Sequence, residues 1–166
     1  MKKLVILFTL SVLILSCKKT EEKAQTKGLI ANKAMVVSAR VEASKIGSDI
    51  LEKGGNAYDA MVATHFALAV VYPVAGNIGG GGFMVYRNND GTKGALDFRE
   101  KAPITAHKDM YLDSLGNVIK NKSTLGPFAV GIPGSVAGAL DVHKKFGSLS
   151  LKELIQPSID LARNGY

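Results

Sequence analysis

The chain has 166 residues, of which 46% are hydrophobic and 21% are charged, with 18 glycines, one cysteine and no tryptophan. This length and composition suit one globular domain, and they exclude a disordered tail, a collagen-like repeat, an internal disulfide and an all-cysteine zinc site. The formal net charge is +7, but no basic stripe with interleaved aromatic residues accompanies it, so we expect no nucleic-acid partner.

The first residues have the pattern of an export signal. Lys2 and Lys3 precede a stretch at 4–15 that is almost continuously apolar. This stretch is shorter than the roughly 20 residues of a membrane-spanning helix. We therefore predict that residues 1–16 are a secretory signal peptide. Its removal takes away two lysines and lowers the net charge from +7 to +5.

Cys17 follows Ser16 directly after the apolar run, an arrangement that resembles the bacterial lipoprotein box. In signals of that class the cysteine becomes the lipidated first residue of the mature chain. We therefore predict a lipid anchor on Cys17 and an exported protein, held at a membrane in the periplasm or at the cell surface. Ordinary cleavage near Ser16, which leaves Cys17 as an incidental thiol, is the alternative. Residues 17–34 then form a flexible, solvated tether.

Strand and helix patterns begin after the tether. The apolar, β-branched run at 34–39 predicts a short buried strand. Gly54 and Gly55 supply the left-handed residue that commonly ends a helix. Between the run at 34–39 and Gly54, apolar residues recur at helical spacing and share one face of a predicted helix: Ala43, Ile46, Gly47, Ile50 and Leu51.

A second helix is expected to run to about Val70, with Asn56 or Asp59 capping its start. Its residues are apolar nearly all round, which is typical of a helix buried inside a larger body. His65 lies on this helix. Neither a second histidine nor an acidic residue follows it by four positions, which favours an ordinary helix histidine over a ligand.

A β-hairpin is predicted at 83–98. The residues at 88–91 have the composition of a tight turn and lie between two runs typical of strands. A further short strand is a candidate at 128–130.

Two helices are predicted in the last third of the chain. The first is expected to begin near Pro133, since proline favours the first turn of a helix, and to close at Gly147. The residues at 150–153 have the form of a capping box, and they predict a second helix that Pro157 interrupts and Gly165 ends. This order of strands and helices indicates an α/β or α+β body.

Five of the seven residues at 76–82 are glycines, and such a cluster can serve ligand binding or close backbone packing. A phosphate-binding loop needs Lys-Ser or Lys-Thr directly after its glycines, but Phe83 and Met84 follow here. A dinucleotide-binding fingerprint needs a strand before the glycines and a helix after them, and the predicted order here is the reverse. Two interpretations stay open. The glycines permit a tightly packed turn under a sheet, or their amide groups point into an anion-binding site.

Arg99 is the candidate binding residue. It stands at the end of the second predicted strand, where folds commonly present functional groups. Its planar guanidinium can hold a carboxylate through two parallel hydrogen bonds. An ion pair with the neighbouring Asp97 or Glu100 is the alternative.

Five stretches, in order, resemble the amino-terminal part of a γ-glutamyltranspeptidase large subunit. They lie at 50–57, 76–84, 97–103, 131–138 and 156–165. The resemblance runs from about Met35 to Tyr166, so we assign residues 35–166 to an incomplete domain of that family.

The resemblance implies an N-terminal-nucleophile hydrolase fold, in which two stacked sheets lie between layers of helices. It implies a precursor that cuts itself before a threonine, whose own amine serves as the general base. That threonine attacks the γ-glutamyl amide of glutathione or a related donor, and water or an amino acid then takes the γ-glutamyl group. The residue that matches Arg99 binds the donor's α-carboxylate. We expect no cofactor and no metal.

In the family, the nucleophile lies beyond the position of residue 166, and Thr64, Thr92, Thr105 and Thr124 match no nucleophile position. We therefore expect no catalytic residue in this chain, no activity and poor folding of the chain alone, and a partner in the small subunit of the same precursor. Two alternatives stay open: a non-catalytic membrane-anchored binding or partner protein built from this fold, and a family acylase acting on another amide.

Overall fold

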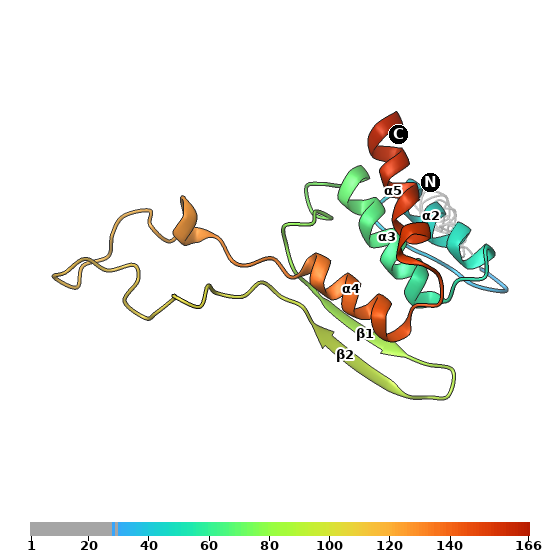
Figure 1. The fold of residues 1–166 in the computed structure, drawn as a ribbon, viewed down its shortest axis with the longest axis horizontal. Helices are drawn as coiled ribbons and strands as arrows, with labels where there is room; N and C mark the ends of the chain where they lie inside the picture. The colour runs from blue at the N-terminus through green and yellow to red at the C-terminus, as the bar shows by residue number, and fades with distance from the viewer. Residues whose placement is uncertain (1–27, 29) are drawn as a thin grey trace, which may run out of the picture. The chain divides into compact units, whose positions relative to one another are not determined.

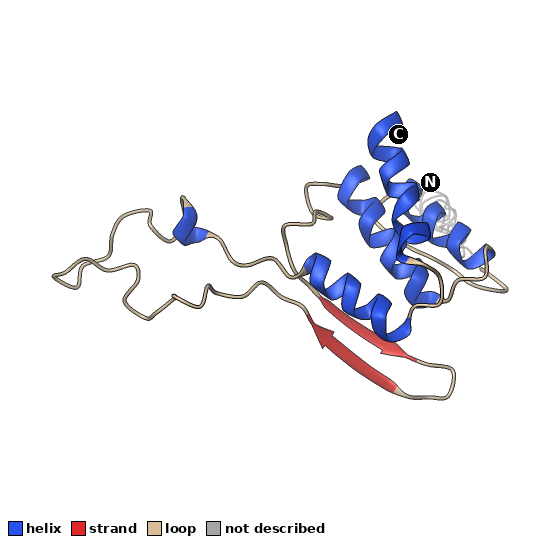
Figure 2. Ribbon diagram, in the orientation of Figure 1, coloured by secondary structure: helices blue, strands red, loops and turns tan. Residues whose placement is uncertain are grey.

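The computed structural model describes residue 28 and residues 30–166, so the predicted signal peptide, Cys17 and most of the tether lie outside the described residues. The elements are, in chain order, α2 (Val41–Glu52), α3 (Ala57–Val71), β1 (Phe83–Arg87), β2 (Lys93–Asp97), the 3-10 helix η1 (Pro127–Ala129), α4 (Ser135–Phe146) and α5 (Leu151–Asn164) (Figures 1 and 2). This mixture of helices and strands is the expected α/β class.

The first two helices form where the sequence predicts them. α2 buries Ala43, Ile46, Gly47 and Ile50 on one face. Gly54 ends this helix with a φ of 94°, in the left-handed region that glycine enters without strain.

Asn56 then caps α3, and both candidate capping residues take part. The Asn56 side chain accepts the backbone N–H groups of Tyr58 and Asp59, and the Asp59 side chain accepts the N–H of Asn56. This reciprocal capping box satisfies donors that a helix start otherwise leaves free.

α3 is the centre of the core and packs against α2, α4 and α5. Ile50, Val142 and Leu154, one from each of these neighbours, are fully buried against it. Three further residues of α3, Met61, His65 and Leu68, are only half-buried. The expected burial of α3 is therefore complete on the sides that face other helices and incomplete on one remaining face.

Asp59 ties α3 to the turn between α4 and α5. Its carboxylate is fully buried and accepts the Ser148 N–H at 3.0 Å, the Ser148 hydroxyl and the Leu149 N–H at 3.4 Å. Burial alone would raise the pKa of Asp59, but the bonds from Ser148, Asn56 and Leu149 outweigh it, and the pKa lies below its ordinary value.

β1 and β2 pair antiparallel, with Met84 opposite Leu96. Gly82 and Phe98 extend the pair by exchanging two backbone hydrogen bonds, of 3.0 and 3.3 Å. Met84 and Leu96 pack against the helical core, whereas Phe83 and Val85 on the opposite face are exposed. The hairpin predicted at 83–98 is therefore confirmed, and one of its faces is covered.

Two predicted strands are wrong. The segment at 34–39 contains no strand, because no other described strand lies beside it to form a ladder. The candidate at 128–130 is instead the 3-10 turn η1, which Pro127 opens.

The helix predicted near Pro133 is confirmed as α4, which begins at Ser135 and closes at Gly147. The N–H groups of Gly134 and Ser135 donate to the Gly80 carbonyl, which satisfies donors that a helix start otherwise leaves free. One predicted helix feature is wrong. Pro157 does not interrupt α5, which continues to Asn164. Burial of Leu154, one turn before the proline, stabilises the helix against the lost hydrogen bond.

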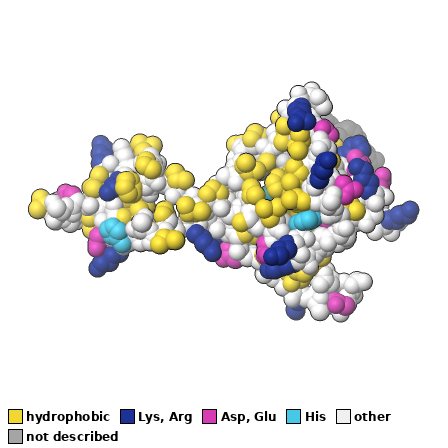
Figure 3. All heavy atoms as spheres, in the orientation of Figure 1, with side chains coloured by type: hydrophobic (Ala, Val, Ile, Leu, Met, Phe, Trp, Pro, Cys, Tyr) yellow, Lys and Arg dark blue, Asp and Glu magenta, His cyan; other side chains and the backbone are white. Residues whose placement is uncertain are grey.

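The segment between Lys101 and Ile132 leaves the helices and the hairpin and returns to the same place. These two residues exchange backbone hydrogen bonds of 3.1 and 2.7 Å where the excursion begins and ends. Ile104 and Leu115 within it are exposed, and Figure 3 shows hydrophobic side chains among basic and histidine ones on its surface. None of the helices in residues 30–166 combines the length and the hydrophobicity of a membrane-spanning helix.

Candidate functional site

Arg99 stands where the sequence predicts it, just past the end of β2. Its backbone N–H donates to Asp97 Oδ1 at 2.9 Å, and its Nε lies 3.3 Å from Glu100 Oε2. Among residues 30–166, Glu100 is the one carboxylate within ion-pair distance of Arg99. The Arg99 side chain is 66% exposed, so this pair is screened by water and holds Arg99 only weakly. The guanidinium therefore remains accessible to a second carboxylate.

Two glycines hold the backbone around Arg99. A Cβ on Gly81 would lie 2.8 Å from Arg99 Cα and 2.6 Å from Glu100 N. A Cβ on Gly134 would overlap the carbonyl oxygen of Phe98. Only glycine permits these approaches, so the strand end that carries Arg99 is clamped between the glycine cluster and the start of α4.

The side chain of Phe98 also packs against glycines at this strand end. Its ring packs between Gly82 and Gly138, where any added Cβ would meet it closely. The sequence does not single out Phe98, although its position between two glycine-rich segments is a signal that could have found it.

The close packing decides between the two interpretations of the glycine cluster. The Gly79 N–H donates to Asn77 Oδ1 at 2.9 Å and the Gly82 N–H donates to the Phe98 carbonyl at 3.3 Å, so these two amides are engaged within the protein rather than presented to an anion. The Gly80 carbonyl accepts the N–H groups of Gly134 and Ser135, which fixes the cluster to the start of α4. The structure thus favours the tightly packed turn.

Glu100 remains ionised beside Arg99. Hydrogen bonding from its own backbone N–H lowers the pKa of the Glu100 carboxyl, burial opposes this, and Arg99 and the Gly81 N–H lower the pKa further. A ligand carboxylate at Arg99 would therefore share the guanidinium with Glu100 or displace it.

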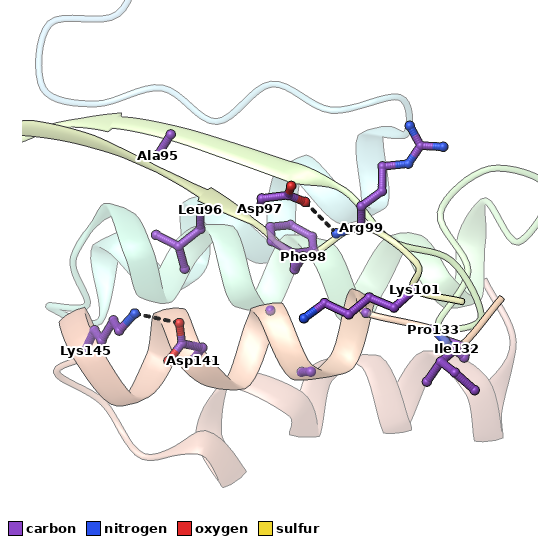
Figure 4. Close-up of a pocket in the computed structure, with 13 residues that line it drawn as sticks. Ala95, Leu96, Asp97, Phe98, Arg99, Lys101, Ile132, Pro133, Asp141 and Lys145 are labelled. Atoms are coloured by element: carbon purple, nitrogen blue, oxygen red, sulfur yellow. Dashed lines mark hydrogen bonds and ion pairs between the residues drawn. The ribbon is translucent and has the colours of Figure 1, made fainter. Parts of the chain in front are cut away.

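A hollow of about 520 Å³ lies between β2 and α4, beside Arg99. Figure 4 shows the Lys101 side chain along this hollow, whereas the Arg99 guanidinium points away from α4. An ion pair of 2.7 Å between Lys145 and Asp141 lies at the other end. Arg99 thus borders the hollow, but its guanidinium points away from the side that α4 forms.

Sequence reasoning missed an aromatic neighbour of Arg99. The Phe83 ring centroid lies 6.0 Å from Arg99 Cζ, within range of a cation–π contact. Phe83 pairs with Asp97 across the hairpin, which brings it beside the strand end. Knowledge of the hairpin register would have predicted that Phe83 lies close to Arg99.

His65 is half-buried on α3. Its Nε2 is buried without a hydrogen-bond partner among the described residues, and burial lowers the pKa of the imidazole. Its interpretation as an ordinary helix histidine stays a prediction. Within residues 30–166, no group of three or more His, Cys, Asp or Glu side chains is arranged to hold a metal ion.

Comparison with known proteins finds one family. The family model described as Gamma-glutamyltranspeptidase matches residues 43–166. The Glutathione hydrolase proenzyme of Pseudomonas sp. (strain A14) is 52% identical over 153 residues, which cover 92% of this chain and 27% of that protein. The Glutathione hydrolase proenzyme of Escherichia coli (strain K12) is 48% identical over 136 residues, or 82% of this chain and 23% of that protein. This chain thus spans about a quarter of the length of these relatives.

Solved structures give the same result. The γ-glutamyltranspeptidase of Helicobacter pylori superimposes with a TM-score of 0.77 at 52% identity, covering 83% of this chain and 40% of that chain. The γ-glutamyltranspeptidase of Pseudomonas nitroreducens, complexed with L-DON, gives 0.73 at 47% identity, covering 80% and 39%. The Bacillus anthracis transpeptidase enzyme CapD gives 0.62 at 31% identity, also covering 80% and 39%. The segment therefore has the fold of the corresponding part of these enzymes.

Proposed function

This chain belongs to the γ-glutamyltranspeptidase family, and from that premise we propose that it is the amino-terminal part of the large subunit of a precursor enzyme. The activity proposed for the whole precursor is transfer or hydrolysis of the γ-glutamyl group of glutathione and related amides. The relatives named as glutathione hydrolase proenzymes support this proposal, since each is about four times as long as the segment it shares with this chain.

Arg99 is proposed to bind the α-carboxylate of the γ-glutamyl donor. The observation that carries this role is an exposed guanidinium on a strand end that Gly81 and Gly134 hold in place. A rigid backbone fixes the position of the guanidinium, whose planar fork then matches both carboxylate oxygens. The exposed pair with Glu100 is weak enough for a donor to compete with it.

The chemical step belongs to the part of the precursor that this chain does not cover. We infer that a threonine at the start of the small subunit attacks the γ-carbonyl of the donor, with its own amine as the base. The amine of the leaving group departs and leaves a γ-glutamyl ester on the threonine. Water or an amino acid then cleaves this ester. Arg99 contributes by holding the donor in place for that attack.

A chimeric enzyme tests the proposal. Residues 30–166 replace the matching segment of the Escherichia coli relative, and self-cleavage and release of p-nitroaniline from γ-glutamyl-p-nitroanilide are measured. We expect both in the chimera, and no turnover above a boiled control from the 166-residue chain alone. An intact, inactive chimera that is well folded would contradict the proposal, and so would turnover by the isolated chain.

We also propose that residues 1–16 direct export and that lipid is attached to Cys17. Expression of the full chain in bacteria with labelled palmitate should label the protein, and Cys17→Ser should abolish the label. Equal labelling of both forms would contradict the anchor.

A further inference from the structure

Arg99 needs a fixed orientation if it is to hold a carboxylate through two parallel hydrogen bonds. Its side chain is 66% exposed, and Glu100 holds it only through one contact of 3.3 Å to Nε. A long, exposed side chain samples many rotamers, and a ligand that has to select one of them loses affinity. The other groups around the guanidinium therefore decide how well Arg99 is prepared for a ligand.

Phe83 is an aromatic residue beside that guanidinium. Its ring centroid lies 6.0 Å from Arg99 Cζ. Phe83 is the first residue of β1 and pairs with Asp97 of β2, so the side chains of both residues lie on the same face of the hairpin. Figure 4 shows that the Arg99 guanidinium points away from α4. The contact therefore lies on the side of the hairpin that the helices leave open.

The backbone fixes both partners of this contact. Directly before Phe83, Gly82 exchanges hydrogen bonds of 3.0 and 3.3 Å with Phe98. On the other strand, the Arg99 N–H donates to Asp97 Oδ1 at 2.9 Å. The ring and the arginine are thus carried by neighbouring positions of one hydrogen-bonded ladder, and their closeness follows from its register.

Phe83 contributes little to the packed core. Its side chain is 64% exposed, whereas Met84 beside it packs against the helices. Substitution of an exposed side chain usually changes the free energy of unfolding only slightly. An effect of Phe83 on binding can therefore be separated from an effect on folding.

The contacts of Arg99 leave one side of the guanidinium free. Glu100 lies at Nε, and the cation–π attraction of Phe83 acts on the planar group as a whole. Among the described residues, the hydrogen bonds of the Arg99 side chain involve Nε alone. Nη1 and Nη2, which form the fork that matches two carboxylate oxygens, thus remain available to a ligand.

We propose that Phe83 is a positioning residue for recognition of the γ-glutamyl donor. Its ring holds the Arg99 guanidinium in one orientation, so that Nη1 and Nη2 meet both oxygens of the donor's α-carboxylate. This rests on the proposed function, because it takes the ligand of Arg99 from there. A carboxamide in the same place offers only one acceptor oxygen, so the oriented fork also favours donors whose α-carboxylate is free.

The chimeric enzyme provides the test, with release of p-nitroaniline from γ-glutamyl-p-nitroanilide as the measurement. Phe83→Leu keeps an apolar side chain and removes the ring. It should raise the Michaelis constant by about fivefold with little change in kcat, and it should leave the constant for the α-carboxamide analogue unchanged. Phe83→Tyr keeps a ring and should retain the parental constant. A Phe83→Leu enzyme with the parental constant would overturn the proposal, and so would equal losses in the leucine and tyrosine variants.

Val85→Ala is the matched control, because Val85 lies on the same face of β1 and is 83% exposed. It should leave the Michaelis constant unchanged. A rise equal to that of Phe83→Leu would assign the effect to the strand and contradict a role of the ring. Self-cleavage and thermal unfolding report whether each variant folds. If Phe83→Leu fails to fold, Phe83→Ile, with a side chain that strands favour, replaces it in the same comparison.

A double-mutant cycle shows whether Phe83 acts through Arg99. In the Arg99→Ala background, Phe83→Leu should have no further effect on the Michaelis constant. Equal effects in both backgrounds would overturn the proposal. An intact, inactive chimera would overturn the proposed function and this inference with it. An active chimera in which Arg99→Ala raises the constant and Phe83→Leu does not would overturn the inference alone.

Discussion

At the scale of single residues, side chains that face away from the candidate site hold the fold around it. Asp59 is the clearest case, because its buried carboxylate accepts the Asn56 N–H at the start of α3 and also the Ser148 N–H, the Ser148 hydroxyl and the Leu149 N–H of the turn before α5. The capping pattern around Asn56 predicts one of these bonds. The bonds from Ser148 and Leu149 span about ninety positions, and no local pattern reports them.

Asp59→Asn should destabilise the chimeric enzyme by about 1–3 kcal/mol at pH 7, because an amide nitrogen would face backbone donors. The folded pKa of Asp59 is lowered, so its contribution is complete above the unfolded pKa of about 3.9 and is lost as pH falls through the folded pKa. Thermal unfolding from pH 7 to pH 3 should therefore show the two curves converging at acid pH.

Asp160→Asn is the control for that substitution, since Asp160 is an exposed carboxylate of α5. It should shift the free energy of unfolding by less than about 0.5 kcal/mol. An Asp59→Asn protein as stable as this control at pH 7 would remove Asp59 from its structural role.

The contacts of Arg99 are predictable from the sequence only in part. Its place at a strand end and its pairing with Glu100 are both predictable from neighbouring positions. Its contact with Phe83 is not, because that depends on the register of the hairpin.

At the scale of elements, the glycine cluster and the start of α4 form one packed unit. Gly134→Ala should destabilise the chimera by about 1–3 kcal/mol or more, since its Cβ meets the backbone of Phe98 and not a side chain that can turn aside. Thermal unfolding is the measurement, and we expect the midpoint to fall by several degrees.

Gly79→Ala is the matched control within the same cluster. A Cβ there meets only Asn77 Oδ1 at 3.4 Å, and the φ of Gly79 is not in the left-handed region. Its unfolding midpoint should stay near that of the parent. If the two alanine variants unfold alike, close packing does not explain these glycines.

Helices were easier to predict here than strands. Capping signals and helical spacing are local, so the start of α3 and the start of α5 follow from a few adjacent residues. A strand exists only beside another strand, and for this reason the apolar run at 34–39 remains unpaired in the described part of the chain. Pro157 failed as a helix breaker because the cost of a proline depends on the packing of the whole helix.

At the scale of the whole molecule, the described residues expose many apolar side chains. Ile104, Leu115 and Leu125 are exposed on the excursion from 102 to 131, and Phe83 and Val85 are exposed on the outer face of β1. We expect the isolated 166-residue chain to unfold without a cooperative transition in a thermal scan followed by circular dichroism. A monodisperse monomer with a sharp transition would contradict this expectation.

The family was recognisable from five sequence motifs. The sequence did not predict where those motifs lie relative to one another in space. The structure shows that the motifs at 76–84, 97–103 and 131–138 pack together around Phe98. Their joint product is a fixed strand end that carries Arg99.

The Michaelis constant of the chimera for glutathione tests the central claim most directly. Arg99→Ala should raise it by about tenfold or more with a smaller change in kcat, and Arg99→Lys should lie in between, because a lysine keeps the charge and loses the fork. Arg163→Ala, which removes an exposed arginine of α5, should leave it unchanged. An Arg99→Ala enzyme with the parental Michaelis constant would show that Arg99 does not bind the donor.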